Sequence, residues 1–339
     1  MNKNGIETFI QNIPKAELHI HIEGSLEPEL MFKIAKRNKI PLKYQSIADL
    51  KRAYAFHNLQ SFLDIYYEGA QALLTEQDFY DMTWAYVEKL KAQNVLHAEI
   101  FFDPQTHTAR GVSFETVVKG VYKALQEGKQ KHGISTSLIM CFLRHLSAKS
   151  AMETLEQSVP FKDMIVGVGL DSSELGNPPS KFTEVFEKAS LLGYLTVAHA
   201  GEEGPAEYIW EALEKLKVLR IDHGIRCIED KNLVKELVKN QIPLTVCPFS
   251  NVKLAVFKKL EEHNLKELLE LGLRVTVNSD DPAYFGGYIT ENLLACQKSL
   301  NLTKENIYTI VKNSFKASFL DKKKKEEFIA TLDNFVFNY

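Results

Sequence analysis

Two histidines one residue apart are the first residues in this sequence that could do chemistry. His19 and His21 lie in the run AELHIHIE (16–23), which is predicted to be a β-strand. Because side chains alternate between the two faces of a strand, both imidazoles point the same way and can share one cation. The alternative is that one or both are hydrogen-bonded core histidines. With a third imidazole and a carboxylate, they would form a nitrogen- and oxygen-rich site that suits Zn²⁺.

Further reactive side chains stand at the ends of three other predicted strands. The runs YLTVAHAGE (194–202), RIDHG (220–224) and RVTVNSDD (274–281) contribute His199, Glu202, Asp222, His223, Asp280 and Asp281. Each residue alone has an ordinary structural explanation, but together they predict a metal site. Because a bound zinc makes hydroxide available near neutral pH, the predicted reaction is a hydrolysis. Glu202 and His223 are then candidates for moving protons, and Asp281 for binding a polar substrate edge.

The elements that must position these residues alternate along the chain. Strands are predicted at 16–23, 95–103, 135–143, 164–172, 194–202, 220–224, 243–248 and 274–281, and amphipathic helical patterns lie between them. Eight β-then-α units predict an α/β fold, a (β/α)₈ TIM-type barrel whose strands all end at one mouth. An open doubly wound sheet is disfavoured because no glycine-rich phosphate turn follows the first strand. A helical insertion after the first strand and extra C-terminal helices complete one predicted domain, residues 1–339.

Composition narrows the classes of partner. The 339 residues carry a net charge of −3, which gives no electrostatic reason to expect a nucleic acid or an anionic membrane as partner. The four cysteines are scattered without C-x-x-C pairs, and no long apolar segment is present, so we expect a cytoplasmic protein. Whether the chain forms a homo-oligomer is left open.

Five ordered motifs together resemble the adenosine/adenine deaminase family of metal-dependent amidohydrolases. They are PKAELHIHIEGSLEPEL (14–30), VAHAGEEG (197–204), RIDHGIR (220–226), TVCPFSN (245–251) and TVNSDDPAYFG (276–286). The resemblance implies one Zn²⁺ per chain, with the ligands His19, His21, His199 and Asp280. It also implies that Glu202 protonates purine N1, that His223 orients the attacking hydroxide and assists its deprotonation, and that Asp281 pairs with N7.

The implied reaction is hydrolytic deamination at C6 of a purine by a zinc-activated water. FFDPQTHTARG (101–111) and GLDSSELG (169–176) resemble the adenine deaminase branch, so we expect conversion of adenine to hypoxanthine and ammonia in purine salvage. The alternative is an adenosine deaminase or a deaminase of a modified adenine. Because only the free base carries an imidazole N–H, we expect Glu174, with Glu23, to accept it. The alternative for Glu174 is a solvent-exposed loop position.

Two other classes of function are weighed against the deaminase. A barrel that only binds partners should have lost a ligand or Glu202, and neither is missing. A phosphoester or lactone hydrolase would favour a second metal. In some amidohydrolases a modified lysine at the end of the fourth strand bridges two metals, but the run IVGVGLDSSE (165–174) contains no lysine. The sequence therefore favours a single metal ion.

Overall fold

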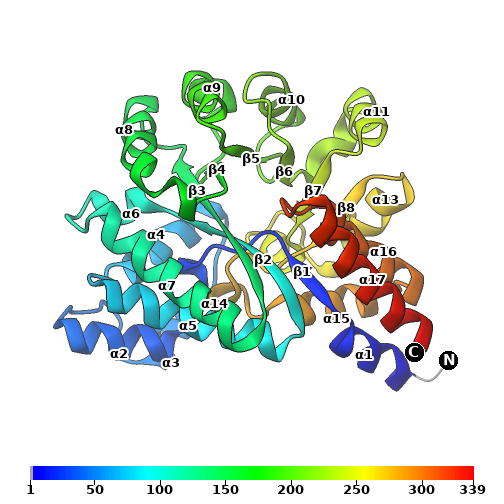
Figure 1. The fold of residues 1–339 in the computed structure, drawn as a ribbon, viewed down its shortest axis with the longest axis horizontal. Coiled ribbons are helices and arrows are strands. Elements are labelled where there is room, and N and C mark those ends of the chain that lie inside the picture. Colours follow the sequence, from blue (N-terminus) through cyan, green and yellow to red (C-terminus); the bar gives the residue numbers. More distant parts are fainter. Residues whose placement is uncertain (1–2) are drawn as a thin grey trace.

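A computed structural model describes residues 3–339 and contains one eight-stranded sheet (Figure 1). Each strand pairs in parallel with the next in chain order. The strands are β1 (Lys15–Glu17), β2 (Val95–Phe102), β3 (Ser135–Leu143), β4 (Gly167–Asp171), β5 (Leu195–Ala200), β6 (Arg220–His223), β7 (Pro243–Val246) and β8 (Arg274–Val277). The predicted (β/α)₈ barrel is confirmed.

The barrel is closed just beyond the ends of β1 and β8. Ile20 and Asp280 form a parallel bridge, in which the amide of Asp280 donates to the carbonyl of His19 at 3.1 Å. The amide of His21 in turn donates to the carbonyl of Asp280 at 3.0 Å. Three residues predicted to bind metal therefore form the closing contact of the barrel.

The first strand is shorter than predicted. β1 ends at Glu17 rather than at residue 23, and η1 (Glu23–Ser25) turns the chain away. Gly24 packs tightly at this turn, since a Cβ atom there would lie 1.9 Å from Oδ1 of Asp281. The turn thus depends on a residue without a side chain and brings the first and last strands together.

Helices surround the strands and have clear sequence signals at their ends. The side chain of Ser113 accepts from the amide of Thr116 at the start of α7, and Gly133 ends that helix with φ of 71°. The helices between successive strands include α6 (Pro104–Thr108), α7 (Phe114–His132), α8 (Ala148–Ser158), η2 (Val159–Met164), η3 (Pro179–Phe182), α9 (Thr183–Leu191), α10 (Ala206–Glu214), η4 (Ile225–Glu229), α11 (Lys231–Asn240), α12 (Pro248–Lys253), η5 (Leu260–Glu262) and α13 (Leu265–Glu270).

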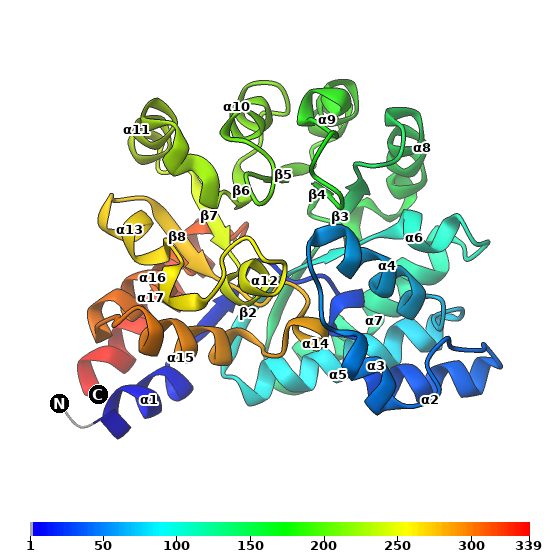
Figure 2. The same cartoon turned by 180° about the vertical axis from the view of Figure 1, so that it is seen from behind.

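The predicted insertion and closing helices are present as well. The chain between β1 and β2 forms α2 (Pro28–Asn38), α3 (Ile47–Ala53), α4 (Leu59–Ala70) and α5 (Glu76–Ala92). After β8 come α14 (Pro282–Phe285), α15 (Ile289–Ser299), α16 (Lys304–Ala317) and α17 (Lys322–Asn338), while α1 (Lys3–Asn12) precedes the barrel. Figure 2 shows α4 and α12 near the centre of the view, in front of the strands. The insertion therefore contributes to the covering of the barrel mouth.

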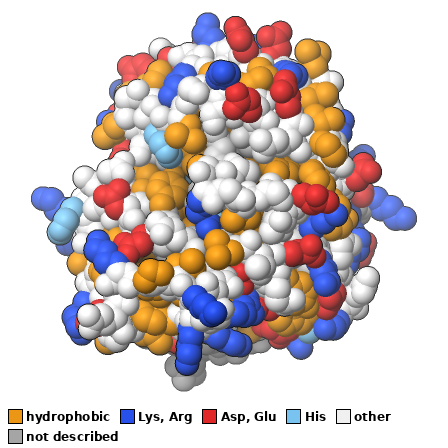
Figure 3. Space-filling view, turned by 90° about the vertical axis from the view of Figure 1, so that its left-hand side faces the viewer, with side chains coloured by type: hydrophobic (Ala, Val, Ile, Leu, Met, Phe, Trp, Pro, Cys, Tyr) orange, Lys and Arg blue, Asp and Glu red, His pale blue; other side chains and the backbone are white. Residues whose placement is uncertain are grey.

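The molecular surface carries both signs of charge. On the face shown in Figure 3, acidic and basic side chains are interspersed with hydrophobic ones. Within the described part of the chain, no helix combines the length and the apolar character that a membrane span requires.

Candidate active site

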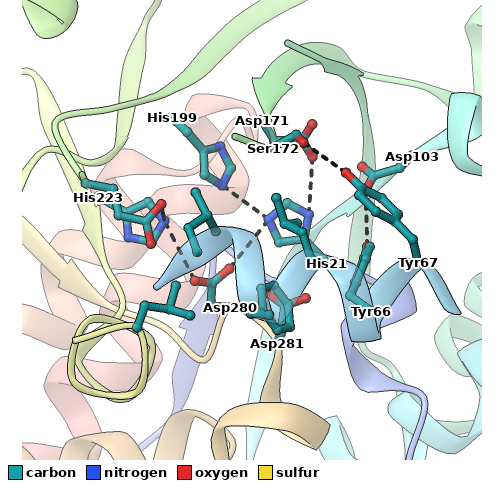
Figure 4. A pocket seen from close by; sticks show the side chains of 15 residues that line it. His21, Tyr66, Tyr67, Asp103, Asp171, Ser172, His199, His223, Asp280 and Asp281 are labelled. Carbon is teal, nitrogen blue, oxygen red and sulfur yellow. Dashed lines mark hydrogen bonds and ion pairs between the residues drawn. The ribbon is translucent and has the colours of Figure 1, made fainter. Parts of the chain in front are cut away.

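Four side chains from three separate segments converge at the barrel mouth, and Figure 4 labels three of them, His21, His199 and Asp280. The four side chains offer ligand atoms that all lie within 4.8 Å of one another and belong to His19, His21, His199 and Asp280. Nε2 of His19 lies 3.1 Å from Oδ1 of Asp280, and Nε2 of His21 lies 3.2 Å from Nε2 of His199. The structure thus brings together the four residues for which the sequence predicted a metal-binding role.

The backbone fixes these ligands in place. Asp280 has φ of 62°, a value in the left-handed region that few side chains adopt without strain. The bridge between β1 and β8 ties the backbone of His19 and His21 directly to Asp280. Strained positions of this kind persist only where the surrounding structure enforces them. The barrel closure supplies that enforcement.

A hydrogen-bonded chain behind His19 orients its ring. Nδ1 of His19 lies 2.9 Å from Oγ1 of Thr245, and Thr245 donates to Oδ1 of Asp222 at 2.7 Å. Because Thr245 donates its hydroxyl hydrogen to Asp222, its oxygen can only accept a hydrogen bond from Nδ1 of His19. The lone pair of His19 is therefore on Nε2, which faces the other ligands.

The electrostatics of the group suit a divalent cation. Burial lowers the pKa of His21 to about 4, and it lowers the pKa of His199 well below the usual range, so both rings are neutral and offer lone pairs. Three imidazole nitrogens and one carboxylate fit a metal of the zinc type. A second grouping would use Cys247, but burial raises the pKa of its thiol well above normal.

Glu202 and His223 stand beside the ligand group. Nε2 of His223 lies 3.6 Å from Oε2 of Glu202 and 3.7 Å from Oδ2 of Asp280. Burial, and after it the charge of Asp280, raises the pKa of Glu202 well above the usual range. Burial lowers the pKa of His223 to about 3. In this setting Glu202 carries a proton to give, and His223 is a neutral base.

One pocket opens onto these groups at the barrel mouth. Its wall combines aromatic and aliphatic side chains of α4 with polar groups at the strand ends. The residues are His21, Leu59, Phe62, Leu63, Tyr66, Tyr67, Asp103, Asp171, Ser172, His199, Glu202, His223, Leu254, Asp280 and Asp281. A pocket of this kind suits a small, flat, polar molecule.

Asp281 lines the pocket as expected. It is 4% exposed, and its Oδ1 has no hydrogen-bond partner among the described residues. Burial and the neighbouring Asp280 raise the pKa of Asp281 well above the usual range, which favours a protonated carboxyl. Asp281 is therefore able to donate a hydrogen bond to a basic ring nitrogen.

The structure places Glu174 away from the pocket wall, contrary to the expectation that it faces the purine. Its Oε1 accepts from the amide of Gly201 at 2.6 Å, and its Oε2 accepts from the amides of Glu202, Glu203 and Gly204 at 3.0, 2.8 and 2.7 Å. The residue is 1% exposed, so the solvent-exposed alternative does not describe it either. Its carboxylate holds the loop that carries Glu202.

Glu23 lies behind the pocket rather than in its wall. Oε1 of Glu23 accepts from the amide of Asp103 at 3.3 Å and lies 2.8 Å from Nε2 of His107. Oε2 of Glu23 is buried without a partner among the described residues. Glu23 therefore fixes the start of the β2–α6 connection instead of reaching into the pocket.

Sequence reasoning missed two carboxylates of the pocket wall. Asp103 follows β2 and Asp171 ends β4, and both line the pocket together with Tyr66 and Tyr67 of α4. Their position at the carboxyl ends of barrel strands was a usable signal, since functional groups of such barrels gather there.

The fold and the site define a (β/α)₈ barrel hydrolase with a candidate metal site of three histidines and an aspartate. The adenosine deaminase family model matches residues 14–335, and the chain belongs to that family.

Two bacterial relatives are called adenine deaminase. The protein of Hahella chejuensis is 58% identical over 98% of this chain and 100% of its own length. That of Wolinella succinogenes is 60% identical over 96% of this chain and 98% of its own length. The crystal structure of adenine deaminase from Arthrobacter aurescens superimposes with a TM-score of 0.94 at 51% identity, covering 96% of this chain and 99% of that one. These similarities support the adenine deaminase branch of the family.

Proposed function

We propose that this chain hydrolyses the 6-amino group of adenine, so that adenine and water give hypoxanthine and ammonia. The observation that carries the proposal is the convergence of His19, His21, His199 and Asp280 beside Glu202 and Asp281 in one pocket. Relatives 58% and 60% identical over nearly the whole chain are called adenine deaminases, which favours adenine over adenosine or a modified adenine.

We infer that one Zn²⁺ is held by the four converging residues. Three imidazoles and a carboxylate form a donor set that zinc prefers, and zinc can expand to five ligands to take a water beside these four. When bound, zinc lowers the pKa of a coordinated water to roughly 7 and so supplies a nucleophile at neutral pH. Asp222 and Thr245 support this role by fixing the ring of His19.

The remaining polar groups divide the proton transfers between them. Glu202, whose raised pKa keeps it protonated, donates to N1 of the purine and so makes C6 more electrophilic. His223 orients the attacking oxygen and assists its deprotonation. Asp281 donates to N7, which fixes the base with C6 toward the metal ligands. Loss of ammonia then leaves a 6-oxopurine.

We further propose that the chain works as a single barrel domain in the cytoplasm, within purine salvage. The four cysteines, at positions 141, 227, 247 and 296, are free and buried, which suits a reducing compartment. Dispersed charge of both signs favours a small-molecule substrate over a nucleic acid or a membrane.

Turnover of adenine and adenosine by the purified, zinc-loaded protein tests the proposal. Release of hypoxanthine and ammonia from adenine, with much slower release of inosine from adenosine, is the expected result. Faster turnover of adenosine would reassign the substrate. No turnover of either compound by protein that contains one zinc per chain would overturn the proposed reaction. Metal content measured on the same sample makes these outcomes distinguishable.

A further inference from the structure

The end of the pocket farthest from His223 is built from carboxylates and tyrosines. Figure 4 shows Asp103, Asp171, Tyr66 and Tyr67 on the side of the pocket opposite to His223. Asp103 is 2% exposed, and its Oδ1 has no hydrogen-bond partner among the described residues. A buried acceptor left without a donor is rare in a folded protein and calls for a ligand or an explanation.

The surroundings hold Asp103 in one orientation. Its Oδ2 accepts from the hydroxyl of Tyr66 at 3.0 Å, and its amide donates to Oε1 of Glu23 at 3.3 Å. Oδ1 meets no N–H or hydroxyl donor among the described residues, although the carboxyls of Asp103 and Asp171 lie within hydrogen-bond reach of each other, and Asp103 belongs to the pocket wall. Oδ1 can accept in either protonation state of the carboxyl, because a carboxyl oxygen keeps a lone pair whether or not it carries the proton.

Asp171 is a different case, although its Oδ1 also lacks a partner. Its Oδ2 lies 3.5 Å from Nδ1 of His21, so this carboxylate already faces one of the proposed ligands. Asp171 is suited to orienting that imidazole. Asp103 lies near His21 as well, since His21, Asp103 and Asp171 have potential ligand atoms within 4.8 Å of one another, but among the described residues Asp103 forms no ion pair or hydrogen bond with a proposed ligand.

The proposed orientation of adenine directs a donor toward this end of the pocket. If Glu202 faces N1 and Asp281 faces N7, the edge with N3 and N9 points away from the metal ligands. In free adenine N9 carries a hydrogen, whereas in adenosine it carries a sugar. Tyr67 donates to or accepts from Oγ of Ser172 at 2.9 Å, so α4 is tied to the β4 end beside Asp103. This contact narrows the space for a group on N9.

We propose that Oδ1 of Asp103 accepts the hydrogen bond from N9–H of free adenine and thereby selects the free base against 9-substituted purines. This inference rests on the proposed adenine deamination and names the residue behind its substrate choice. A site with a buried acceptor rejects a substrate that lacks the matching donor, because the acceptor is then left unpaired. Glu23 and Tyr66 are positioning residues that hold Asp103.

Asp103→Leu, assayed with adenine and with 9-methyladenine, tests the proposal. Leucine keeps the branched shape of the side chain but removes the acceptor. We expect kcat/KM for adenine to fall roughly 5- to 150-fold, because the N9–H donor is then buried without an acceptor, while the value for 9-methyladenine changes little. Asp103→Asn retains an acceptor oxygen, so its kcat/KM for adenine should lie between the values of the wild type and of Asp103→Leu. Asp163→Leu, the same change at an exposed position in η2, is the control for both substrates.

Different outcomes would contradict the role of Asp103 and the proposed deamination of adenine. A wild-type protein that turns over 9-methyladenine as well as adenine would overturn the role of Asp103, as would an equal fall for both substrates in Asp103→Leu. A wild-type protein that releases no hypoxanthine from adenine would overturn the proposed function instead. Should Asp103→Leu not fold, Tyr66→Phe replaces it, with an expected 2- to 10-fold loss, roughly, confined to adenine. Equal losses with both substrates in Tyr66→Phe would contradict the inference.

Discussion

Buried carboxylates within the barrel strands and at the barrel mouth differ in how completely they are paired. In β2, Glu99 accepts from Arg220 through one oxygen and from the amide of Phe319 through the other, with His97 at 3.2 Å. Both oxygens of Glu17 in β1 are likewise bonded, to Ser279 and to Tyr86. Burial opposes the ionisation of Glu99, yet the adjacent Arg220 lowers its pKa to about 2. Both carboxyl groups therefore find all their partners within the chain.

At the mouth the pairing is incomplete. Asp103, Asp171 and Asp281 each keep one buried oxygen without a partner among the described residues. Burial, and after it the charge of Asp171, raises the pKa of Asp103 well above its usual range. A buried carboxyl whose partners all come from the chain stabilises the fold. A buried carboxyl with an unpaired oxygen is available to bind a ligand. Substitutions should separate stability from activity along this division.

Removal of the metal should have the largest effect on activity. Dialysis against a chelator, or His19→Ala, takes away the means of activating water, and we expect turnover of adenine to fall on the order of 10⁴-fold or more. Activity of the chelated wild type should return with added Zn²⁺, whereas His19→Ala should stay inactive and bind less metal. Metal content and ammonia release measure both effects. Unchanged turnover in metal-free protein would contradict the role given to the mouth.

Glu202→Gln should remove the proton donor while leaving the ligand group intact. We expect kcat to fall by about 10²- to 10⁴-fold, the usual contribution of a general acid, with zinc content unchanged. Glu207→Gln, the same substitution at an exposed position in α10, is the control. Substantial activity in Glu202→Gln would show that the proton reaches the purine by another route.

The sequence predicted the barrel and the metal-binding residues best. The barrel follows from local patterns in the sequence, and the position of the metal-binding residues follows from the barrel. The alternation of strands and helices predicts a barrel, and a barrel brings all strand ends to one mouth, so His199 and Asp280 could be expected near His19 although they are far apart in the chain. The early end of β1 could not be predicted, because it depends on the contact of Gly24 with Asp281 across the closed barrel.

The surroundings of two carboxylates, Glu174 and Asp103, could not be predicted from the sequence. Glu174 binds four amides that lie 27 to 30 residues further along the chain, and nothing in its own surroundings indicates them. Two glycines accompany this contact, and a Cβ atom at Gly204 would lie 2.6 Å from the carboxyl carbon of Glu174. Asp103 precedes Pro104 and resembles an ordinary residue at the start of a helix. Its proposed role follows from the buried oxygen Oδ1, whose surroundings come from segments far apart in the chain.

Within the barrel strands, Arg220→Met should affect stability more than chemistry. The substitution leaves Glu99 as an uncompensated buried charge, which typically costs about 3–5 kcal/mol in the free energy of unfolding. Lys188→Met breaks the exposed pair with Glu156 and should cost about 0–1 kcal/mol. Urea unfolding of the metal-loaded proteins measures both. Two results for Arg220→Met would contradict the distinction between the paired carboxylates of the strands and those of the mouth. One is wild-type stability, and the other is a loss of turnover as large as that of Glu202→Gln.

Glu174→Gln should have the smallest effect of the four changes predicted in this Discussion. It tests whether Glu174 holds the loop of Glu202 or contacts the purine. The amide loses the charge that four backbone N–H groups share and turns an NH₂ toward at least one of them, so we expect about 1–3 kcal/mol of lost stability. Because the loop carries Glu202, kcat should fall, though less than in Glu202→Gln, and equally for adenine and 9-methyladenine. If Glu174 instead met the imidazole N–H, the substitution would change the preference between these substrates. The ratio of their kcat/KM values therefore tests whether Glu174 acts on the loop or on the base.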